Sequence, residues 1–484
     1  MDFYLIAVSV YVVSLLAVGI VKSRKVKTQD DFMVAGRSTP MWFLVATLVV
    51  TWIGSGSLFG SAGLAFRMGF SALWFSAGAW VGIIVIYFLA HRVRRIGEYT
   101  LSDILEKRYN PTARIVGSTA IILAYLTITG YQFRGGGRLL NILTGIDPIV
   151  GAAIFCLVVI GFTMSAGMVS VITVDLFNGI AMTLGVLLAV PLAFSAFGGS
   201  AQLATLPPEN FEVLGGNSAV WAVGLFLPTF FLLLSESTIY QKFFTAKDEQ
   251  TARKAVIGMV VGVVIIETAL ASVAIFGSSV YSTQAPFLGP DGILDKATTE
   301  TILLHIARFD LPIWAGILLL CAAVAIILST ANSFLMITST NITRDLYQRF
   351  INPGVSQGTI VRFQRVWILV LGVTAFVVAN FFKSILDMAF TAYAIVGAGI
   401  TPALLAAFLW KRVTPAGGVA SIVSAIVVTV VITALNGLMP EPWIDTDYII
   451  IPSAVVSIMA LVVVSLMTPV SPEEKWKPFL LRKD

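Results

Sequence analysis

Thirteen apolar stretches of about 20 residues take up most of this 484-residue chain, and short polar segments join them. A helix of about 20 residues, rising about 1.5 Å per residue, crosses a hydrocarbon core of about 30 Å. Lipid offers no partners to backbone N–H and C=O groups, so such stretches fold as helices. We therefore predict an all-α polytopic membrane protein with about thirteen transmembrane helices. The predicted spans are residues 3–21, 41–66, 70–90, 115–140, 149–168, 170–196, 218–241, 255–281, 313–340, 364–382, 385–410, 417–436 and 448–468.

The composition supports a membrane-embedded chain. Hydrophobic residues make up 57% of it and charged residues 12%, about half the charged share of soluble domains. This excludes a secreted disulfide scaffold and a disordered chain, and it argues against a nucleic-acid partner although the net charge is +5. Cys156 and Cys321 both fall inside apolar stretches, so nothing indicates a disulfide or a metal site.

The distribution of basic residues predicts the orientation. If the N-terminus lies outside, 25 of the 31 Lys and Arg fall in inner segments, which indicates an N-out, C-in protein with an odd number of spans. The first stretch lacks a basic n-region and a small-residue cleavage site, so we predict a first span and not a cleavable signal peptide. We expect a multi-pass protein of the cell membrane, surrounded by lipid, with no obligate protein partner.

Two of the predicted spans are interrupted near their middle. Between residues 54 and 60, five of seven positions are Gly or Ser, and the seventh span contains Pro228 and the polar run at residues 235–238. Such breaks free backbone carbonyls to bind a cation or a solute. Close helix packing through small residues is the alternative.

Interrupted helices five spans apart are typical of an inverted five-helix repeat. We expect the halves at residues 41–196 and 218–410 of a single transporter domain that covers residues 1–484. Residues 1–40 would be the first span and an inner loop, and residues 411–484 two accessory spans and a short cytoplasmic tail.

Polar side chains inside the bilayer indicate a cation site. Asp175 lies about five residues into its span from the inner side, and Ser329 lies about 16 residues, or roughly 24 Å, below the outer end of its own span. The two depths match, and carboxylate and hydroxyl oxygens are ligands that hard cations prefer. Alternatively, Ser329 and Thr330 bond carbonyls of their own helix and Asp175 caps a neighbour.

Further charges inside the spans are candidates for solute contact. Arg134 would suit a carboxylate, with snorkelling to the headgroups as the alternative that we expect for Arg138. Glu236, in the second break, would bind an ammonium group, a proton or Lys242. We expect Glu267 to pair with a hydroxyl or an amide of a neighbouring helix.

Short motifs in and between the spans follow one known pattern. They are Asp31-Phe32-Met33-Val34-Ala35-Gly36-Arg37 before the second span, Thr51-Trp52-Ile53-Gly54 to Gly63 within it, Tyr99-Thr100-Leu101-Ser102-Asp103 to Arg108-Tyr109 after the third, Thr173-Val174-Asp175 in the sixth, Tyr240-Gln241-Lys242 to Ala246-Lys247 after the seventh, and Ser329-Thr330-Ala331-Asn332-Ser333 to Asp345-Leu346-Tyr347 at the ninth. With these motifs and thirteen spans, nearly the whole chain resembles the sodium:solute symporter family, which contains proline, sugar, sialic acid, pantothenate and choline symporters.

This resemblance implies the leucine-transporter fold, with spans two to eleven as the inverted-repeat core. It also implies symport of Na⁺ with a small polar organic solute, such as an amino acid, a carboxylate or a sugar, by alternating access. Na⁺ would then be a co-transported ion and not a permanent cofactor.

The resemblance further implies specific site residues. The main Na⁺ site of the family maps to the broken second span and the hydroxyl pair, that is Val50, Ile53, Ile326, Ser329 and Thr330. A second Na⁺ site, present in some members, maps to Asp175, Asn332 and Ser333, but several relatives have a hydroxyl or a carboxylate where Asn332 stands, which leaves this site open. We expect the solute to contact Ser55, Gly56, Ser57, Gln132, Arg134, Glu236 and Tyr393.

Other functions stay open at this point. One is a proton-coupled or Na⁺-independent transporter of the same fold, with Asp175 or Glu236 as the proton carrier. A sensor that binds solute without moving it is another, although family members that sense usually carry a signalling domain. We do not expect an enzyme, because the chain has 2 His and no nucleophile, base and orienting group at a common depth.

Overall fold

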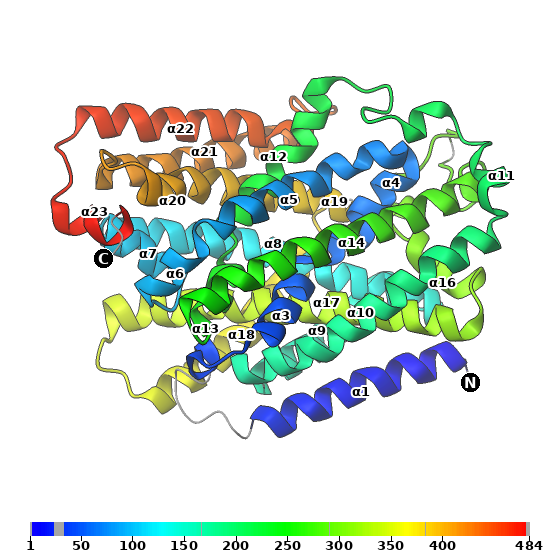
Figure 1. Ribbon diagram of the computed structural model, residues 1–484, viewed down its shortest axis with the longest axis horizontal. Coiled ribbons are helices and arrows are strands. Elements are labelled where there is room, and N and C mark those ends of the chain that lie inside the picture. The colour runs from blue at the N-terminus through cyan, green and yellow to red at the C-terminus, as the bar shows by residue number, and fades with distance from the viewer. Residues whose placement is uncertain (1, 24–32, 166, 290, 383, 481–484) are drawn as a thin grey trace.

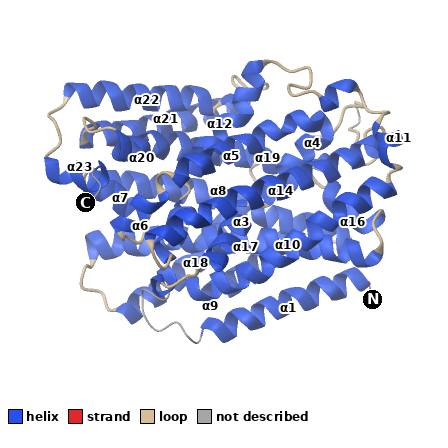
Figure 2. Cartoon of the chain, viewed as in Figure 1, coloured by secondary structure: helices blue, strands red, loops and turns tan. Residues whose placement is uncertain are grey.

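The computed structural model describes residues 2–23, 33–165, 167–289, 291–382 and 384–480. Throughout these ranges the regular elements are helices and no strand forms, as predicted (Figures 1 and 2). Part of the basic cluster after the first span, at residues 24–27, and the start of the first family motif, at residues 31–32, lie outside them. The helices are α1 Phe3–Ser23, α3 Met41–Trp52, α4 Ala62–Met68, α5 Leu73–Tyr87, α6 Ala90–Ile96, α7 Leu101–Arg108, α8 Pro111–Thr144, α9 Pro148–Ser165, α10 Met168–Ala196, α11 Gly199–Leu203, α12 Ala219–Ser235, α13 Ser237–Thr245, α14 Glu249–Tyr281, α15 Lys296–Thr299, α16 Ile302–Phe309, α17 Ile313–Thr340, α18 Gln357–Ala379, α19 Ile385–Tyr393, α20 Gly399–Leu409, α21 Pro415–Leu438, α22 Ile450–Met467 and α23 Glu473–Leu480.

Twelve helical segments of the described chain are long and apolar enough to cross a membrane, and α3 is a shorter apolar helix. The predicted second span is divided here, because α3 ends at Trp52 and helix resumes at Gly56. From Gly56 the helical segment continues to Tyr87 and so includes the predicted third span. Gly69, with φ 65°, separates α4 from α5, and a Cβ at this position would lie 2.3 Å from the Asn210 carbonyl oxygen. The thirteen predicted stretches are therefore all helical, as twelve long segments and the shorter α3, and the second and the seventh are interrupted.

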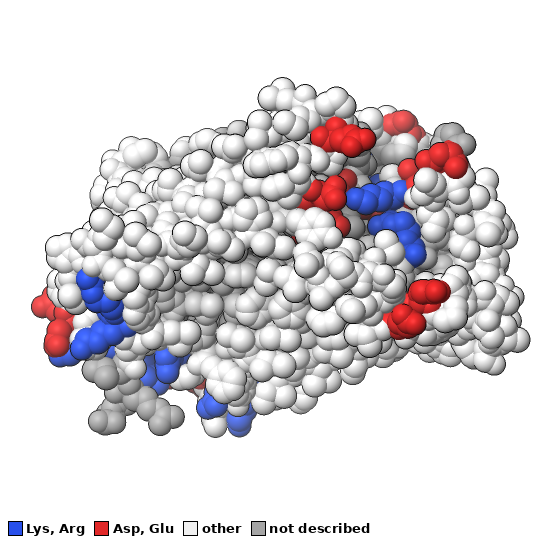
Figure 3. Space-filling view, turned by 90° about the horizontal axis from the view of Figure 1, so that it is seen from above, with Lys and Arg blue, Asp and Glu red and all other residues white. Residues whose placement is uncertain are grey.

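The outer surface suits a membrane. The beginning of α1 and the helix α23 lie at opposite ends of the long axis, as an odd number of crossings requires (Figure 1). Figure 3 shows mostly Lys and Arg, with an acidic patch at the edge, at one end of this face and a mixed acidic and basic group on the other half, with an uncharged band between them. Charged side chains are expensive in lipid, so such a band is what contact with hydrocarbon demands.

The two breaks have nearly the same backbone geometry. After α3, Ile53 is extended with φ −75° and ψ 102°. After α12, Glu236 is extended with φ −68° and ψ 98°. Both positions are buried, so both helices end inside the bundle. This likeness is what two equivalent helices of an inverted repeat would show.

Small residues let the helices approach closely. A Cβ at Gly78 of α5 would lie 2.0 Å from the carbonyl oxygen of Phe226 on α12, and one at Gly185 of α10 would lie 2.5 Å from that of Leu318 on α17. Helix association in membranes depends on such packing, because lipid provides no hydrophobic drive between helices. The buried helix α17 is thereby pressed against α10, which carries Asp175.

We predict that Gly78→Val lowers the thermal unfolding midpoint of the detergent-solubilised protein, because the added side chain meets the α12 backbone. Overpacking of this kind costs about 1–3 kcal/mol. Gly161→Val is the matched control, because nothing lies within 4 Å of a Cβ at Gly161. Equal midpoints for the two variants would contradict the close packing of α5 on α12.

Candidate functional site

Three backbone carbonyls of the α3 break converge on one hydroxyl of α17. Thr330 Oγ1 lies 3.4 Å from the carbonyl oxygen of Val50, 3.5 Å from that of Thr51 and 3.3 Å from that of Ile53. A hydroxyl has one proton to donate, so most of this oxygen cluster is free to accept a positive charge. Ile326 is buried one helical turn before Thr330. Carbonyl and hydroxyl oxygens in this arrangement suit a hard cation such as Na⁺.

The two neighbouring hydroxyls face different helices. Thr330 faces α3, whereas the hydroxyl of Ser329 donates a hydrogen bond to Asp175 Oδ1 on α10. The predicted match in depth between Asp175 and Ser329 is therefore confirmed. Ser329 is placed beside the carboxylate and not on the carbonyls of Val50 and Ile53.

Asp175 is the centre of a buried polar cluster. Its carboxylate accepts hydrogen bonds from the hydroxyls of Thr47 and Ser329, and it lies 3.1 Å from the ammonium nitrogen of Lys242. The same ammonium lies 3.0 Å from the carbonyl oxygen of Thr47 and donates to the hydroxyl of Thr51. The alternative that Asp175 caps a neighbouring helix is not realised.

The remaining residues of the predicted second Na⁺ site separate. Ser333 Oγ lies 3.4 Å from the Thr51 hydroxyl, at the edge of the Asp175 cluster. Asn332 faces α9, where its side-chain oxygen accepts the Thr163 hydroxyl proton at 2.8 Å. From the sequence we expected Lys242 only as a partner of Glu236, because the depth of a residue along its helix does not show which neighbouring helix its side chain faces.

A small cavity of about 20 Å³ lies beside the α3 break. Four of the predicted solute contacts line it, namely Gly56, Ser57, Glu236 and Tyr393, and Thr330 also reaches its wall. Ser55 and Gln132 lie behind this wall, where the Ser55 N–H donates to Gln132 Oε1 at 2.9 Å. Gln132 therefore holds the broken backbone in place.

Two buried carboxylates face the cavity. One oxygen of Glu236 accepts from the Tyr125 hydroxyl at 2.6 Å, while its Oε2 has no hydrogen-bond partner within the described part of the chain. Glu267 accepts from the Trp80 indole at 2.8 Å, from Ser57 at 3.0 Å and from the Trp52 indole at 3.2 Å. The predicted hydroxyl partner of Glu267 is confirmed, but its place in the cavity wall was missed.

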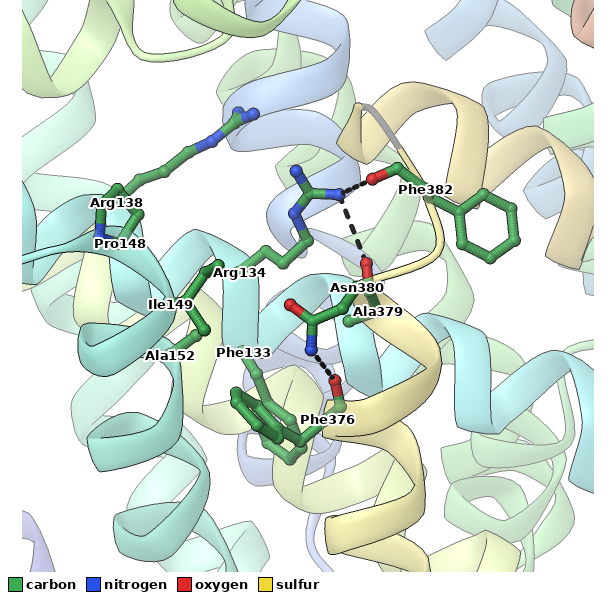
Figure 4. Close-up of a pocket in the computed structure, with 10 residues that line it drawn as sticks. All are labelled: Phe133, Arg134, Arg138, Pro148, Ile149, Ala152, Phe376, Ala379, Asn380 and Phe382. Carbon is green, nitrogen blue, oxygen red and sulfur yellow. Dashed lines mark hydrogen bonds between the residues drawn. The ribbon is translucent and has the colours of Figure 1, made fainter.

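Arg134 lies in a different pocket from Glu236. Its guanidinium donates to the carbonyl oxygens of Ala379 and Phe382, in a pocket of about 170 Å³ at the outer end of α8 (Figure 4). The geometry therefore gives no support to Arg134 as a solute contact in the central cavity. Arg138 forms an ion pair with the buried Glu300, so the expectation that it snorkels to the headgroups is wrong.

The model of the sodium:solute symporter family matches residues 32–425. The chain belongs to the sodium:solute symporter family. It is 27% identical over 495 residues to the osmoregulated proline transporter OpuE of Bacillus subtilis, covering 96% of this chain and 94% of the relative. It is 26% identical over 491 residues to a sodium/proline symporter of Staphylococcus aureus, covering 96% and 92%. The protein is accordingly a multi-pass membrane protein, consistent with a plasma-membrane transporter, that couples Na⁺ to the symport of a small solute.

Solved structures show that this symporter has the leucine-transporter fold. A Na⁺-coupled sialic acid symporter, solved substrate-bound and outward-open, superposes with a TM-score of 0.79 at 19% identity, covering 97% of this chain and 98% of that one. A nucleobase-cation-symport-1 family transporter superposes at 0.57 and 13% identity, covering 92% and 97%. These neighbours and the family as a whole are transporters.

Two family motifs of the symporter meet at its inner end. Arg114 of α8 lies 2.7 Å from Asp103 of α7 and 2.6 Å from Asp345, which follows α17, and Arg344 also pairs with Asp103. Burial alone would raise the pKa of Asp103, but the guanidinium groups of Arg344 and Arg114 hold it below its usual value. Asp103 therefore stays ionised at neutral pH, and the network joins α7 and α8 to the end of α17.

We predict that Arg114→Ala destabilises the symporter by about 3 kcal/mol, because the buried carboxylates of Asp103 and Asp345 each lose one of the two guanidinium groups that pair with them. Arg349→Ala is the control, since Arg349 pairs with Glu106 from a side chain that is 51% exposed, and such pairs contribute about 0–1 kcal/mol. Thermal unfolding in detergent measures both variants. A loss for Arg349→Ala as large as that for Arg114→Ala would contradict the central place of Arg114.

Proposed function

We propose that the solute carries a positively charged amine, and that an amino acid suits the site best. The observation that supports this proposal is the unpartnered, buried Oε2 of Glu236 at the cavity. A buried carboxylate is costly without a counter-charge. An ammonium group bound there would supply both the charge and the missing hydrogen bond.

The rest of the cavity wall favours the same class of solute. Among the lining residues that the structure describes, none is Lys or Arg, and Glu267 adds a second carboxylate. The aromatic rings of Trp52, Phe75 and Tyr131 complete the wall, and such rings attract cations through their faces. A sugar would hydrogen-bond to these acids but bring no counter-charge, and a simple carboxylate would be repelled by them.

Na⁺ would supply the charge for the other end of an amino acid. We assign the Na⁺ site to Val50, Ile53, Ile326 and Thr330, with Ser329 adjacent. Because Thr330 belongs both to this cluster and to the cavity wall, a bound Na⁺ would place a positive charge beside the solute carboxylate. The proline transport described for two relatives involves a solute of this kind, with an amine and a carboxylate.

Symport then follows from differential binding. In the proposed cycle, Na⁺ orders the α3 break, which completes the solute cavity, and the two ligands together favour closure to the outside. Residues 41–196 and 218–410 would be the two five-helix repeats of the transporter domain, with residues 1–40 and 411–484 as flanking segments. The ion pairs Arg138–Glu300 and Arg114–Asp345 would tie the two repeats together at the outer and the inner ends.

We predict Na⁺-dependent uptake of an amino acid by proteoliposomes. A panel of labelled amino acids, monocarboxylates, sugars and choline is tested with an imposed Na⁺ gradient and a K⁺ control.

Glu236→Gln should weaken apparent solute affinity by about tenfold or more, because a charged hydrogen bond contributes about 1.5–3 kcal/mol. Glu441→Gln, an exposed glutamate of the last outer loop, is the control. Uptake that ignores Na⁺ and follows a pH gradient would favour the proton-coupled alternative.

We further predict that Thr330→Ala raises the Na⁺ concentration for half-maximal uptake by about tenfold, because the variant lacks the hydroxyl ligand. Thr338→Ala tests an equally buried threonine two turns along the same helix, whose hydroxyl bonds the Phe334 carbonyl at 2.7 Å. Its Na⁺ dependence should match that of the wild type. Unchanged Na⁺ dependence in Thr330→Ala would overturn the assignment of this site.

A further inference from the structure

We propose that the ammonium group of Lys242 fills the position of a second cation, so that this symporter moves one Na⁺ with each solute molecule. The inference rests on the proposed Na⁺-coupled uptake and concerns its stoichiometry. It starts from a disagreement between the expected second Na⁺ site and the residues that surround Asp175.

The ammonium is fully satisfied by the cluster. Its three N–H donors meet three acceptors, namely Asp175 Oδ2 at 3.1 Å, the Thr47 carbonyl oxygen at 3.0 Å and the Thr51 hydroxyl. The side chains of Lys242 and Asp175 are each 1% exposed, so water does not compete for these contacts. A buried pair with every hydrogen bond made is a stable arrangement of two charges.

The same oxygens are those that a Na⁺ ion would need. Carboxylate, hydroxyl and carbonyl groups are the usual ligands of hard cations, and all three kinds surround the ammonium of Lys242. A Na⁺ ion at Asp175 would therefore either displace this ammonium or meet another positive charge at contact distance. A second Na⁺ does not fit while Lys242 is in place.

One of the expected second-site ligands is also engaged elsewhere. Asn332 Oδ1 accepts from Thr163 at 2.8 Å, on the α9 side of α17. Asp175 contacts the lysine directly, whereas Ser333 lies 3.4 Å from the Thr51 hydroxyl at the edge of the cluster. With Lys242 in place, the three expected ligands do not surround one cation together, and the ammonium takes its acceptors from Asp175, Thr47 and Thr51 instead.

The break after α12 brings the lysine to this place. Lys242 lies six residues after Glu236, on α13, which packs against α3 at Thr47 and Thr51. Because the side chain is covalently attached, its charge is not released inside with the solute. It neutralises Asp175 in every cycle, and only the ion at Thr330 is transported.

The coupling ratio of the wild-type protein is the decisive measurement. In proteoliposomes with the membrane potential clamped at zero, a solute gradient is opposed to a Na⁺ gradient until net flux stops. With one Na⁺ per solute, an about tenfold Na⁺ gradient balances an about tenfold solute gradient, whereas two Na⁺ balance an about hundredfold one. We expect the first result, and the second would overturn the inference.

Variants test the role of Lys242 itself. Lys242→Met exposes the Asp175 oxygens to Na⁺, so the Hill coefficient of uptake for Na⁺ should rise from about 1 toward about 2. The double variant Lys242→Met with Asp175→Asn carries no carboxylate charge at position 175 for a second Na⁺ to neutralise. Its Hill coefficient should return to about 1. Lys247→Met, an exposed lysine five residues further on, should behave as the wild type.

The possible failures can be told apart. A Lys242→Met protein with normal uptake and a Hill coefficient of about 1 would overturn the inference. If that variant does not fold, the wild-type coupling ratio still decides. Absence of Na⁺-dependent uptake of every solute in the wild type would instead overturn the proposed function.

Discussion

The pairing of backbone polar groups in lipid is the constraint on which the rest of this structure depends. A helix that stops inside a bilayer must find new partners for its free N–H and C=O groups. Both breaks find one on the same helix, α8. Gln132 accepts the Ser55 N–H at 2.9 Å, and the Tyr125 hydroxyl accepts the Ser237 N–H at 2.7 Å. These two α8 residues are seven positions apart, or about two turns on one face.

The hydrogen bonds that pair the free backbone groups at the two breaks also position the candidate site residues. Tyr125 also donates to Glu236 at 2.6 Å, so the residue that completes the second break positions the carboxylate at the cavity. At the first break, carbonyls that the helix no longer uses converge on Thr330. The proposed solute cavity and the proposed Na⁺ site thus arise where the two interrupted helices meet α8 and α17.

Charge in the interior is balanced locally. The pairs Asp175–Lys242 and Arg138–Glu300 are each more than four-fifths buried, and Arg114 with Asp103 and Asp345 forms the inner network. Glu236 and Glu267 have hydroxyl and indole partners but no basic one among the described ion pairs. In the proposed function, the solute ammonium would supply the positive charge that these two carboxylates lack.

The sequence by itself determined the helical spans, the positions of both breaks and the depth at which Asp175 meets Ser329. These properties depend on hydrophobic length and residue order, which can be read along the chain. The tertiary structure decided which neighbour each side chain faces. Consecutive residues point about 100° apart around a helix, so Ser329 contacts α10 and Thr330 contacts α3. For the same reason Arg134 faces away from the cavity that Glu236 lines. Spans that are apolar all round carry no stripe that would show this rotation, and so only the packed bundle could assign Lys242 to Asp175.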